Sequence, residues 1–295
     1  MTNEEMRAKI EAGQGFIAAL DQSGGSTPKA LKGYGIEEGT YSGDEEMFAL
    51  IHQMRSRIIT SPCFSGEKVI GAILFEKTMD GEVEGKPTPA ALTERGIVPF
   101  IKIDKGLEEE RDGVQLMKPM PDLDALLTRA KGLGVFGTKE RSVINLANEA
   151  GIAAVVGQQF EVATQVLRHG LVPIIEPEVN IKSADRDACD RILLAEILRH
   201  LDRLPEGSEV MLKLSLPAEA GLFQPLVDHP RVLRVVALSG GFSRAEACEQ
   251  LARNPGMIAS FSRALLSDLR QQQSDDEFDR TLGTAIDEIH AASVA

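Results

Sequence analysis

Short apolar runs recur along the chain, and each is followed by a longer segment with helical periodicity. Eight such runs are present, at 15–20, 69–75, 98–104, 135–139, 172–178, 209–215, 235–241 and 257–262. Runs of this length, rich in Val and Ile and alternating with helical stretches, are typical of parallel strands joined by crossover helices. Four consecutive runs begin at 98, 135, 172 and 209, at an even interval of 37 residues. We therefore expect eight parallel strands.

The segments between these runs carry helix start signals. Thr2 and Glu5 have the spacing of a capping box, which predicts that the first helix begins there. Ser274 and Glu277 predict the start of the last helix in the same way. Ser183 is expected to cap the helix that follows the fifth run.

Eight strand–helix units in about 250 residues are typical of a (β/α)8 TIM barrel. An open doubly wound sheet is the alternative. We expect a single barrel domain over residues 1–295, preceded by an N-terminal helix. Segment 22–68 is too long for a simple crossover, so we expect a helical insertion or lid between the first two strands. Residues 264–295 are expected to form C-terminal helices.

Composition excludes several classes of protein. The formal net charge of −13 argues against a general nucleic-acid binder, which needs a basic face. The N-terminal segment lacks the apolar core of a signal peptide, and no window resembles a membrane span, so a cytoplasmic protein is expected. The three cysteines have no CxxC spacing, and the five histidines never stand at metal-ligand spacing, so no metal site is expected.

Ionisable side chains stand where the predicted strands end. In a barrel of this class the reacting groups lie at the carboxyl ends of the strands. Along the first six runs these groups are Asp21, Glu76, Lys77, Lys102, Asp104, Lys139, Arg141, Glu176, Glu178 and Lys213. Charged residues inside strands are rarely buried unless they are paired. A ring of ion pairs that merely fills the barrel is the alternative to an active site.

Lys213 lies in the middle of the apolar run "EVMLKLS". A lysine becomes nucleophilic when burial and neighbouring cations favour its neutral form, and it then forms Schiff bases with carbonyl compounds. Lys139, two strands away, is expected to be that neighbouring cation. Glu176 and Glu178 are two residues apart on one strand, so both are expected to face the barrel interior and approach the amine. Such a pair can divide the work of proton donor and acceptor.

The last two runs end in groups suited to binding a phosphate. They offer backbone N–H groups, hydroxyls and one guanidinium, from Ser239, Gly240, Gly241, Ser262 and Arg263. TIM barrels commonly bind a phosphate at these two strands, where glycine lets the backbone approach closely. A tight turn alone is the alternative for the diglycine. A second anion site is expected to combine Lys102, Ser23 and Ser26 across the mouth.

These residues lie in motifs that resemble class I fructose-1,6-bisphosphate aldolases, and the bacterial branch more than the animal one. The motifs are "ALDQSGGS", "IKIDKG", "KER", "VPIIEPE", "LKLSLP", "LSGGFS" and "FSRAL", in this order over nearly the whole chain. The resemblance implies a metal-independent lyase of glycolysis. It would interconvert fructose 1,6-bisphosphate with dihydroxyacetone phosphate and glyceraldehyde 3-phosphate, with these sugar phosphates as its partners.

The resemblance also implies a role for each matching residue. Lys213 matches the lysine that forms the Schiff base with the C2 ketone, so no cofactor is needed. Glu176 matches the general acid–base carboxylate, and Asp21 the aspartate that assists cleavage between C3 and C4. The other expected catalytic groups are Lys139 and Glu178. The expected phosphate-binding groups are Lys102, Arg141, Ser239, Gly240, Gly241, Ser262, Arg263, Ser23 and Ser26.

Some positions depart from the family pattern. The chain ends "HAASVA", without the terminal tyrosine of the animal enzymes. Gln22 stands where an acidic residue is usual, Ala30 replaces an arginine, and Ser262 directly precedes Arg263 instead of being separated from it.

Two alternative functions stay open. One is another Schiff-base barrel, such as a transaldolase-like or deoxy-sugar aldolase, and the other is a non-catalytic protein that binds sugar phosphates. The sequence leaves the oligomeric state open.

Overall fold

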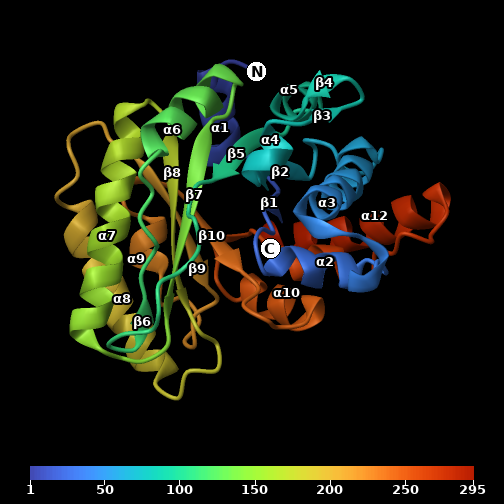
Figure 1. Cartoon of the computed structure of the whole chain (residues 1–295). Helices are drawn as coiled ribbons and strands as arrows, with labels where there is room; N and C mark the ends of the chain where they lie inside the picture. The colour runs from blue at the N-terminus through green and yellow to red at the C-terminus, as the bar shows by residue number, and fades with distance from the viewer.

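Eight parallel strands form a nearly closed barrel in the computed structural model, which describes residues 1–295 (Figure 1). The strands are, in barrel order, β1(Phe16–Leu20), β2(Val69–Leu74), β5(Val98–Lys102), β7(Gly137–Ile144), β8(Val172–Val179), β9(Val210–Ser215), β10(Val232–Leu238) and β11(Ile258–Ala259). The circle is completed where the backbone N–H of Ala19 donates to the carbonyl of Phe261 at 3.1 Å. The expected (β/α)8 barrel is confirmed, and the open doubly wound sheet is excluded.

Helices surround this barrel (Figure 1). They are α1(Asn3–Ala12), α2(Ser26–Gly33), α3(Gly43–Thr60), α4(Glu76–Met79), α5(Thr88–Glu94), α6(Leu123–Gly132), α7(Glu149–Arg168), α8(Arg186–Leu201), α9(Gln224–Val227), α10(Arg244–Ala252), α11(Arg263–Leu266) and α12(Asp275–Ser293). The short strands β3(Glu82–Val83) and β4(Lys86–Pro87) form a hairpin, and β6(Val114–Gln115) pairs antiparallel with β7. None of the helices is both long enough and apolar enough to cross a bilayer.

The strand predictions are confirmed in number and order, but several bounds differ, most of all those of β7, β10 and β11, which covers only Ile258–Ala259. β7 continues to residue 144, five residues beyond the apolar run, because it keeps pairing with β8 through Arg141, opposite Glu176. The charged residues of this stretch interrupt the apolar run, so the pattern of apolar residues did not predict that the strand continues. β10 covers 232–238, so the diglycine follows the strand instead of ending it.

Two of the three helix starts are confirmed. Both capping boxes are present, Thr2 with Glu5 and Ser274 with Glu277. The expected cap at Ser183 is wrong, because α8 begins three residues later, after Asp185. The hydroxyl of Ser183 instead accepts a hydrogen bond from the N–H of Asp185 at 3.3 Å, within the turn that precedes the helix.

Segment 22–68 contains α2, the 3-10 turn η1(Glu38–Thr40) and α3, at the side of the barrel where α12 also lies (Figure 1). Arg57 on α3 connects the two regions. Its guanidinium donates to the carbonyl of Gln273 at 2.7 Å and to Asp275 at 2.9 Å. The expected extra helices are present, and a lid role for this segment stays a prediction.

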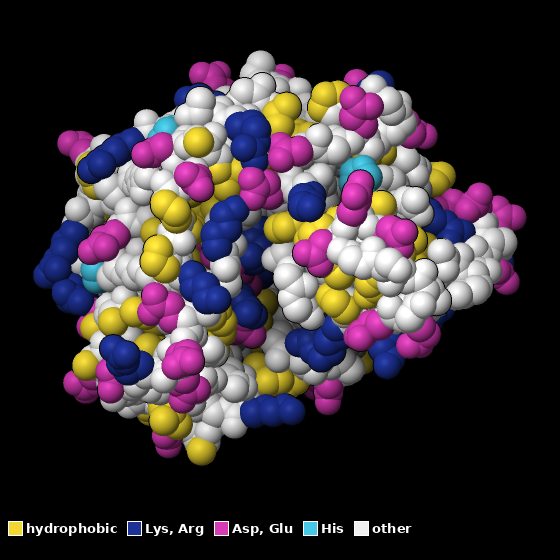
Figure 2. Space-filling view, in the orientation of Figure 1, with side chains coloured by type: hydrophobic (Ala, Val, Ile, Leu, Met, Phe, Trp, Pro, Cys, Tyr) yellow, Lys and Arg dark blue, Asp and Glu magenta, His cyan; other side chains and the backbone are white.

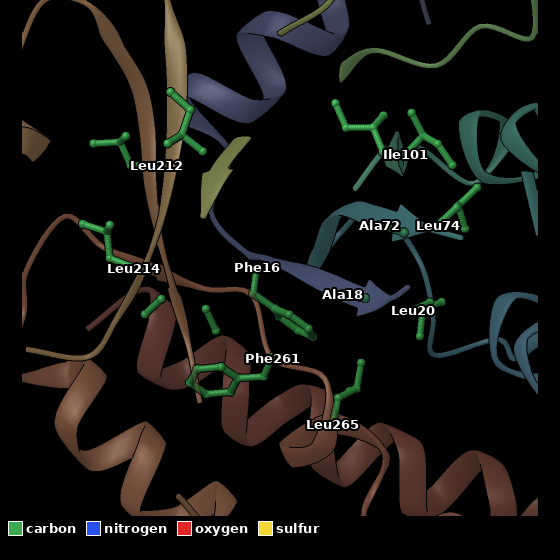
Figure 3. Packing of buried hydrophobic residues seen from close by; sticks show 14 of the residues in the cluster. Phe16, Ala18, Leu20, Ala72, Leu74, Ile101, Leu212, Leu214, Phe261 and Leu265 are labelled. Carbon is green, nitrogen blue, oxygen red and sulfur yellow. The ribbon is translucent and has the colours of Figure 1, made fainter. Parts of the chain in front are cut away.

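Side chains alternate between two apolar layers along each barrel strand. On β9, Met211 belongs to the cluster inside the barrel, whereas Leu212 and Leu214 belong to the larger cluster between strands and helices. Figure 3 shows Leu212 and Leu214 with other members of this larger cluster, including Phe261. The same alternation turns Lys213 into the barrel. The interior is thus apolar at one end and charged at the carboxyl ends of the strands.

Candidate active site

Lys213 is buried inside the barrel mouth, with only 4% of its surface exposed. Its Nζ lies 3.1 Å from Oε1 of Glu176. Strand register explains this contact. Ile174 of β8 pairs with Met211 of β9, and two residues further along each strand Glu176 and Lys213 stand side by side. The lysine that the sequence analysis singled out therefore faces an acidic partner in a largely water-excluded site.

A second lysine shares the same carboxylate. Nζ of Lys139 lies 2.8 Å from Oε2 of Glu176 and 2.7 Å from Oδ2 of Asp21. The contact with Glu176 is electrostatic, because it lacks the geometry of a directed hydrogen bond. The four groups form one chain of alternating charge, from Asp21 through Lys139 and Glu176 to Lys213. Four strands that are far apart in the sequence contribute to it.

The charges fix the ionisation of two members of this chain. Burial by itself would raise the pKa of Asp21, but the positive charges of Lys139 and Lys213 outweigh burial and hold that pKa below its usual value. Burial would likewise lower the pKa of Lys139, but Asp21 and Glu176 raise it above its usual value. Lys139 therefore stays a cation and Asp21 stays an anion at neutral pH.

Lys102 lies at the neighbouring strand end and has its own acidic partner. Its Nζ lies 2.6 Å from Oδ1 of Asp104 and 2.9 Å from the carbonyl oxygen of that residue. Burial lowers the pKa of Lys102, with Asp104 opposing this shift and the charge of Lys139 adding to it. Asp104 stands in the quoted motif "IKIDKG", but the sequence analysis gave it no role.

Glu178 contacts a different cation from Glu176. Its Oε2 lies 2.8 Å from Nη1 of Arg141, which stands two residues after Lys139 on β7. Burial would lower the pKa of Arg141, but Glu178 and Glu176 raise it. Of the two glutamates that were expected to approach the amine, only Glu176 forms an ion pair with Lys213.

The diglycine after β10 adopts backbone conformations that favour glycine, with φ of +58° at Gly240 and +114° at Gly241. A Cβ atom on Gly240 would lie 2.7 Å from Cγ2 of Ile181, so the backbone also packs closely there. A Cβ on Gly241 would lie 3.5 Å from Nη2 of Arg263, which places this guanidinium beside the turn. Ser239, just before the turn, is buried.

Arg263 is exposed, and its side chain makes no hydrogen bond or ion pair within the protein. Its five N–H donors are therefore available to an anion. The adjacent Ser262 is already engaged, because its Oγ accepts a hydrogen bond from Nε2 of Gln22. The arrangement of Gly240, Gly241 and Arg263 is compatible with binding a phosphate, whereas a turn alone would not require the free guanidinium.

Ser23 and Ser26 lie at the start of α2 and bond to each other. The N–H of Ser23 donates to Oγ of Ser26 at 2.9 Å, and that hydroxyl donates to the Ser23 carbonyl at 2.8 Å. Lys102 makes no hydrogen bond with either serine, and its Nζ donates to Asp104 instead. The second anion site expected from these three residues stays a prediction.

Arg55 is a residue that the sequence analysis missed. It lies on α3, is completely buried, and donates to Oγ1 of Thr78 at 2.7 Å and to the carbonyl of Gln22 at 2.5 Å. No carboxylate pairs with it, and burial lowers its pKa to about 10 although Asp21 opposes the shift. The sequence held a signal, because Arg55 is four residues from Ile51 on the apolar stripe of this helix.

Figure 2 shows basic side chains gathered along a hollow in the middle of the visible face, on a protein whose net charge is −13. No group of three or more His, Cys, Asp or Glu side chains is placed to hold a metal ion. The groups that meet at the barrel mouth are the amine of Lys213, four carboxylates and three further cations: Asp21, Asp104, Glu176, Glu178, Lys102, Lys139 and Arg141.

Comparison with known proteins found a family model and solved structures that match this chain. The family model for class I fructose-bisphosphate aldolase, a glycolytic enzyme, matches residues 3–212. A fructose-bisphosphate aldolase from Plasmodium falciparum, solved in complex with TRAP and a small-molecule inhibitor, has a TM-score of 0.80 at 21% identity. The match covers 99% of this chain and 94% of that one. At such identity the structural likeness shows the fold alone.

A second structural match is a protein of Corynebacterium glutamicum, with a TM-score of 0.57 at 14% identity, covering 98% of this chain and 92% of that one. Class I aldolases form a covalent Schiff base between a lysine and the substrate and need no metal. The relation to the bacterial branch in particular stays a prediction. The family model spans well over half of the sequence, and the chain belongs to the class I fructose-bisphosphate aldolase family.

Proposed function

We propose that this aldolase cleaves fructose 1,6-bisphosphate to dihydroxyacetone phosphate and glyceraldehyde 3-phosphate, and catalyses the reverse condensation, through a Schiff base on Lys213. The observation that carries the proposal is the burial of Lys213 with its Nζ 3.1 Å from Glu176. A buried amine with an adjacent carboxylate has the two groups that imine formation needs, a nucleophile and a proton carrier.

In the cleavage direction, Lys213 transfers a proton to Glu176 and attacks the C2 ketone. The carbinolamine loses water as the carboxyl group returns the proton to the leaving hydroxyl. The resulting iminium accepts the electron pair of the C3–C4 bond while the C4 hydroxyl loses its proton to a base. The enamine is then reprotonated, and water hydrolyses the imine and releases the second product.

Asp21 and Glu176 are both candidates for the base that takes the proton of the C4 hydroxyl. A carboxylate whose pKa is lowered binds a proton weakly, so Asp21 is a poor acceptor while Lys139 is charged. We assign the proton transfers to Glu176, which lies against the amine. Asp21 holds Lys139 and accepts a hydrogen bond from a substrate hydroxyl. Lys139, which contacts both carboxylates, stabilises the negative charge that develops between them.

The two ends of the substrate need separate anion sites. Gly240, Gly241 and Arg263 are proposed to bind one phosphate, with Ser239 and Ser262 adjacent to them. Lys102 and Arg141 are proposed to act at the other side of the mouth, with Ser23 and Ser26. The free guanidinium of Arg263 supports this assignment, because an arginine kept unpaired beside a glycine turn is suited to bidentate phosphate binding.

Borohydride trapping tests the proposal. The protein is incubated with dihydroxyacetone phosphate, reduced with sodium borohydride, digested and mapped by mass spectrometry. The expected result is one stable adduct, on the peptide containing Lys213, and loss of labelling and activity in Lys213→Met. Lys105→Met is the matched control, because Lys105 is an exposed lysine in a surface ion pair with Glu76. An unlabelled Lys213, together with activity that a chelator abolishes, contradicts the proposal.

The bisphosphate preference needs a separate measurement. We expect kcat/KM for fructose 1,6-bisphosphate to exceed that for a sugar monophosphate, because two anion sites then contribute to binding. Equal turnover of a monophosphate or of a deoxy-sugar phosphate supports the rival Schiff-base aldolase. Binding of sugar phosphates without turnover supports the non-catalytic alternative.

A further inference from the structure

A cavity of about 340 Å³ lies outside the barrel mouth, between α10 and the loops that follow β8 and β9. We call it the α10 cavity. Its walls are half apolar and half polar, and its lining includes Ile181, Leu216, Pro217, Phe242, Gln250 and Arg253. This volume is at the lower end of the roughly 300–1,000 Å³ typical of small-molecule sites.

The α10 cavity is separate from the proposed catalytic groups. Lys213 points into the barrel, whereas Leu216, three residues later, belongs to the apolar layer between strands and helices. None of the residues that line the cavity takes part in the charge chain of the mouth. Ile181, however, also packs against Gly240, where an added Cβ would lie 2.7 Å from its Cγ2. The α10 cavity and the proposed phosphate site at Gly240 are therefore neighbours, and Ile181 contributes to both.

Two arginines line the cavity, and only one of them is paired. Nε of Arg186 lies 3.2 Å from Oδ1 of Asp190, and this arginine also donates to the carbonyl of Leu216. Arg253 is exposed and makes no side-chain hydrogen bond or ion pair. The carboxamide of Gln250, also on the cavity wall, makes no hydrogen bond either. One uncompensated positive charge and one free amide thus border an apolar surface.

We propose that the α10 cavity binds a small organic anion, with its apolar body against Leu216, Pro217 and Phe242 and its carboxylate or phosphate on Arg253. An unpaired arginine attracts an anion locally although the protein as a whole carries a charge of −13. The apolar wall excludes inorganic ions as preferred ligands, because they would leave it in contact with water. The free amide of Gln250 supplies a second hydrogen bond to the anionic group.

Calorimetric titration of the full chain with 2-naphthoate tests this site. We expect saturable one-to-one binding that weakens about tenfold or more in Arg253→Ala, because a charge-assisted hydrogen bond is lost. Ala220→Leu, which places a larger side chain on the cavity wall, should also weaken binding. Arg203→Ala is the matched control, because Arg203 is likewise exposed and unpaired but lies outside the cavity lining. The affinity of this variant for 2-naphthoate should equal that of the unmodified protein.

Three results would overturn the proposal. One is the absence of saturable binding to the unmodified protein. Another is a loss of affinity in Arg263→Ala as large as that in Arg253→Ala, which places the probe in the proposed phosphate site. The third is an equal loss in Arg203→Ala, which indicates unspecific charge attraction. Lys213→Met should bind the probe as the unmodified protein does, so failure of this site and failure of the Schiff-base proposal are distinguishable.

Discussion

Lys139 and Asp21 form a buried ion pair that joins β7 to β1 across the interior of the barrel, with 2.7 Å between Nζ and Oδ2. Two other strands, β2 and β5, separate β1 from β7 in the sheet, so no backbone pairing connects them. Both side chains are nearly inaccessible to water, with 3% and 11% of their surface exposed. The pair therefore connects separate walls of the mouth and sets the charge state around Lys213.

Removal of the cation should cost both activity and stability. Lys139→Met leaves Asp21 without its cation and leaves Glu176 with Lys213 as its one remaining cation. An uncompensated buried charge costs about 3–5 kcal/mol of stability. We expect a loss of that order in the free energy of unfolding by urea titration, and a large loss of turnover. In the control Lys105→Met, which breaks an exposed pair with Glu76, the expected loss is at most about 1 kcal/mol. Equal losses in both variants would contradict a structural role for Lys139.

Acid should remove the stability that Asp21 contributes. Its pKa is lowered in the folded protein, so its contribution is complete above the unfolded value of about 3.9 and is lost as the pH falls towards the folded value. We expect the difference in unfolding free energy between the protein and Asp21→Asn to be constant from pH 5 to 7 and to shrink below about pH 4. Chemical denaturation at a series of pH values measures it. A gap that widens on acidification would show that the sign is wrong.

Glu140 should have the opposite pH dependence. It is completely buried on β7, and its Oε1 has no hydrogen-bond partner. Burial raises its pKa, with the charge of Asp104 adding to the shift, so ionisation above the unfolded value of about 4.3 opposes folding. We expect Glu140→Gln to raise the unfolding free energy at pH 7 by about 1 kcal/mol or more, and this gain to vanish below about pH 4.

The control for this prediction is Glu38→Gln. Glu38 is exposed and forms no side-chain hydrogen bond or ion pair, so its replacement should leave the unfolding free energy unchanged at both pH values. A destabilisation of Glu140→Gln at pH 7 that disappears at pH 4 would contradict the prediction, because it would indicate that the carboxylate is needed in its charged form.

Arg55 should affect substrate binding without contacting the substrate. Arg55→Met leaves Oγ1 of Thr78 and the carbonyl of Gln22 without their buried donor, which should lower the unfolding free energy by about 1–3 kcal/mol. Gln22 in turn donates to Ser262, next to Arg263. We therefore expect KM for the sugar bisphosphate to rise more than kcat falls.

Steady-state kinetics measures this difference. Arg280→Met is the control, because Arg280 is an exposed arginine that donates only to the backbone carbonyl of Asp276 on its own helix. A fall in kcat at unchanged KM in Arg55→Met would contradict the proposed route through Gln22 and Ser262.

Much of the barrel mouth was predictable because its charged residues recur at the same interval as the strands. The interval is 37 residues between consecutive members of the series Lys102, Lys139, Glu176 and Lys213, as it is between the starts of their predicted strands. Equal strand–helix units bring equivalent positions to the same level of the barrel. The alternation on β9, with apolar residues on both sides of Lys213, then predicts that the lysine faces inward.

Local patterns failed where distant segments decide the outcome. Ser183 has the residue type of a cap, but the turn before α8 uses its hydroxyl elsewhere. Arg55 stands on the apolar stripe of α3, but its charge argues for a surface position, and only the folded structure buries it beside Thr78 and Gln22. The pairing of Glu178 with Arg141 depends on the register of β7 against β8, which spacing within one strand does not contain.

The amino-acid sequence by itself determined the barrel, the order of its strands, the inward direction of Lys213 and the family, because these depend on periodicity along the chain and on motifs of contiguous residues. Only the tertiary structure decided which carboxylate contacts which amine, the buried position of Arg55, and the cavity beside α10. These features depend on distances between side chains of different strands and helices. Such distances arise from the register and packing of the folded chain, and no local pattern specifies them.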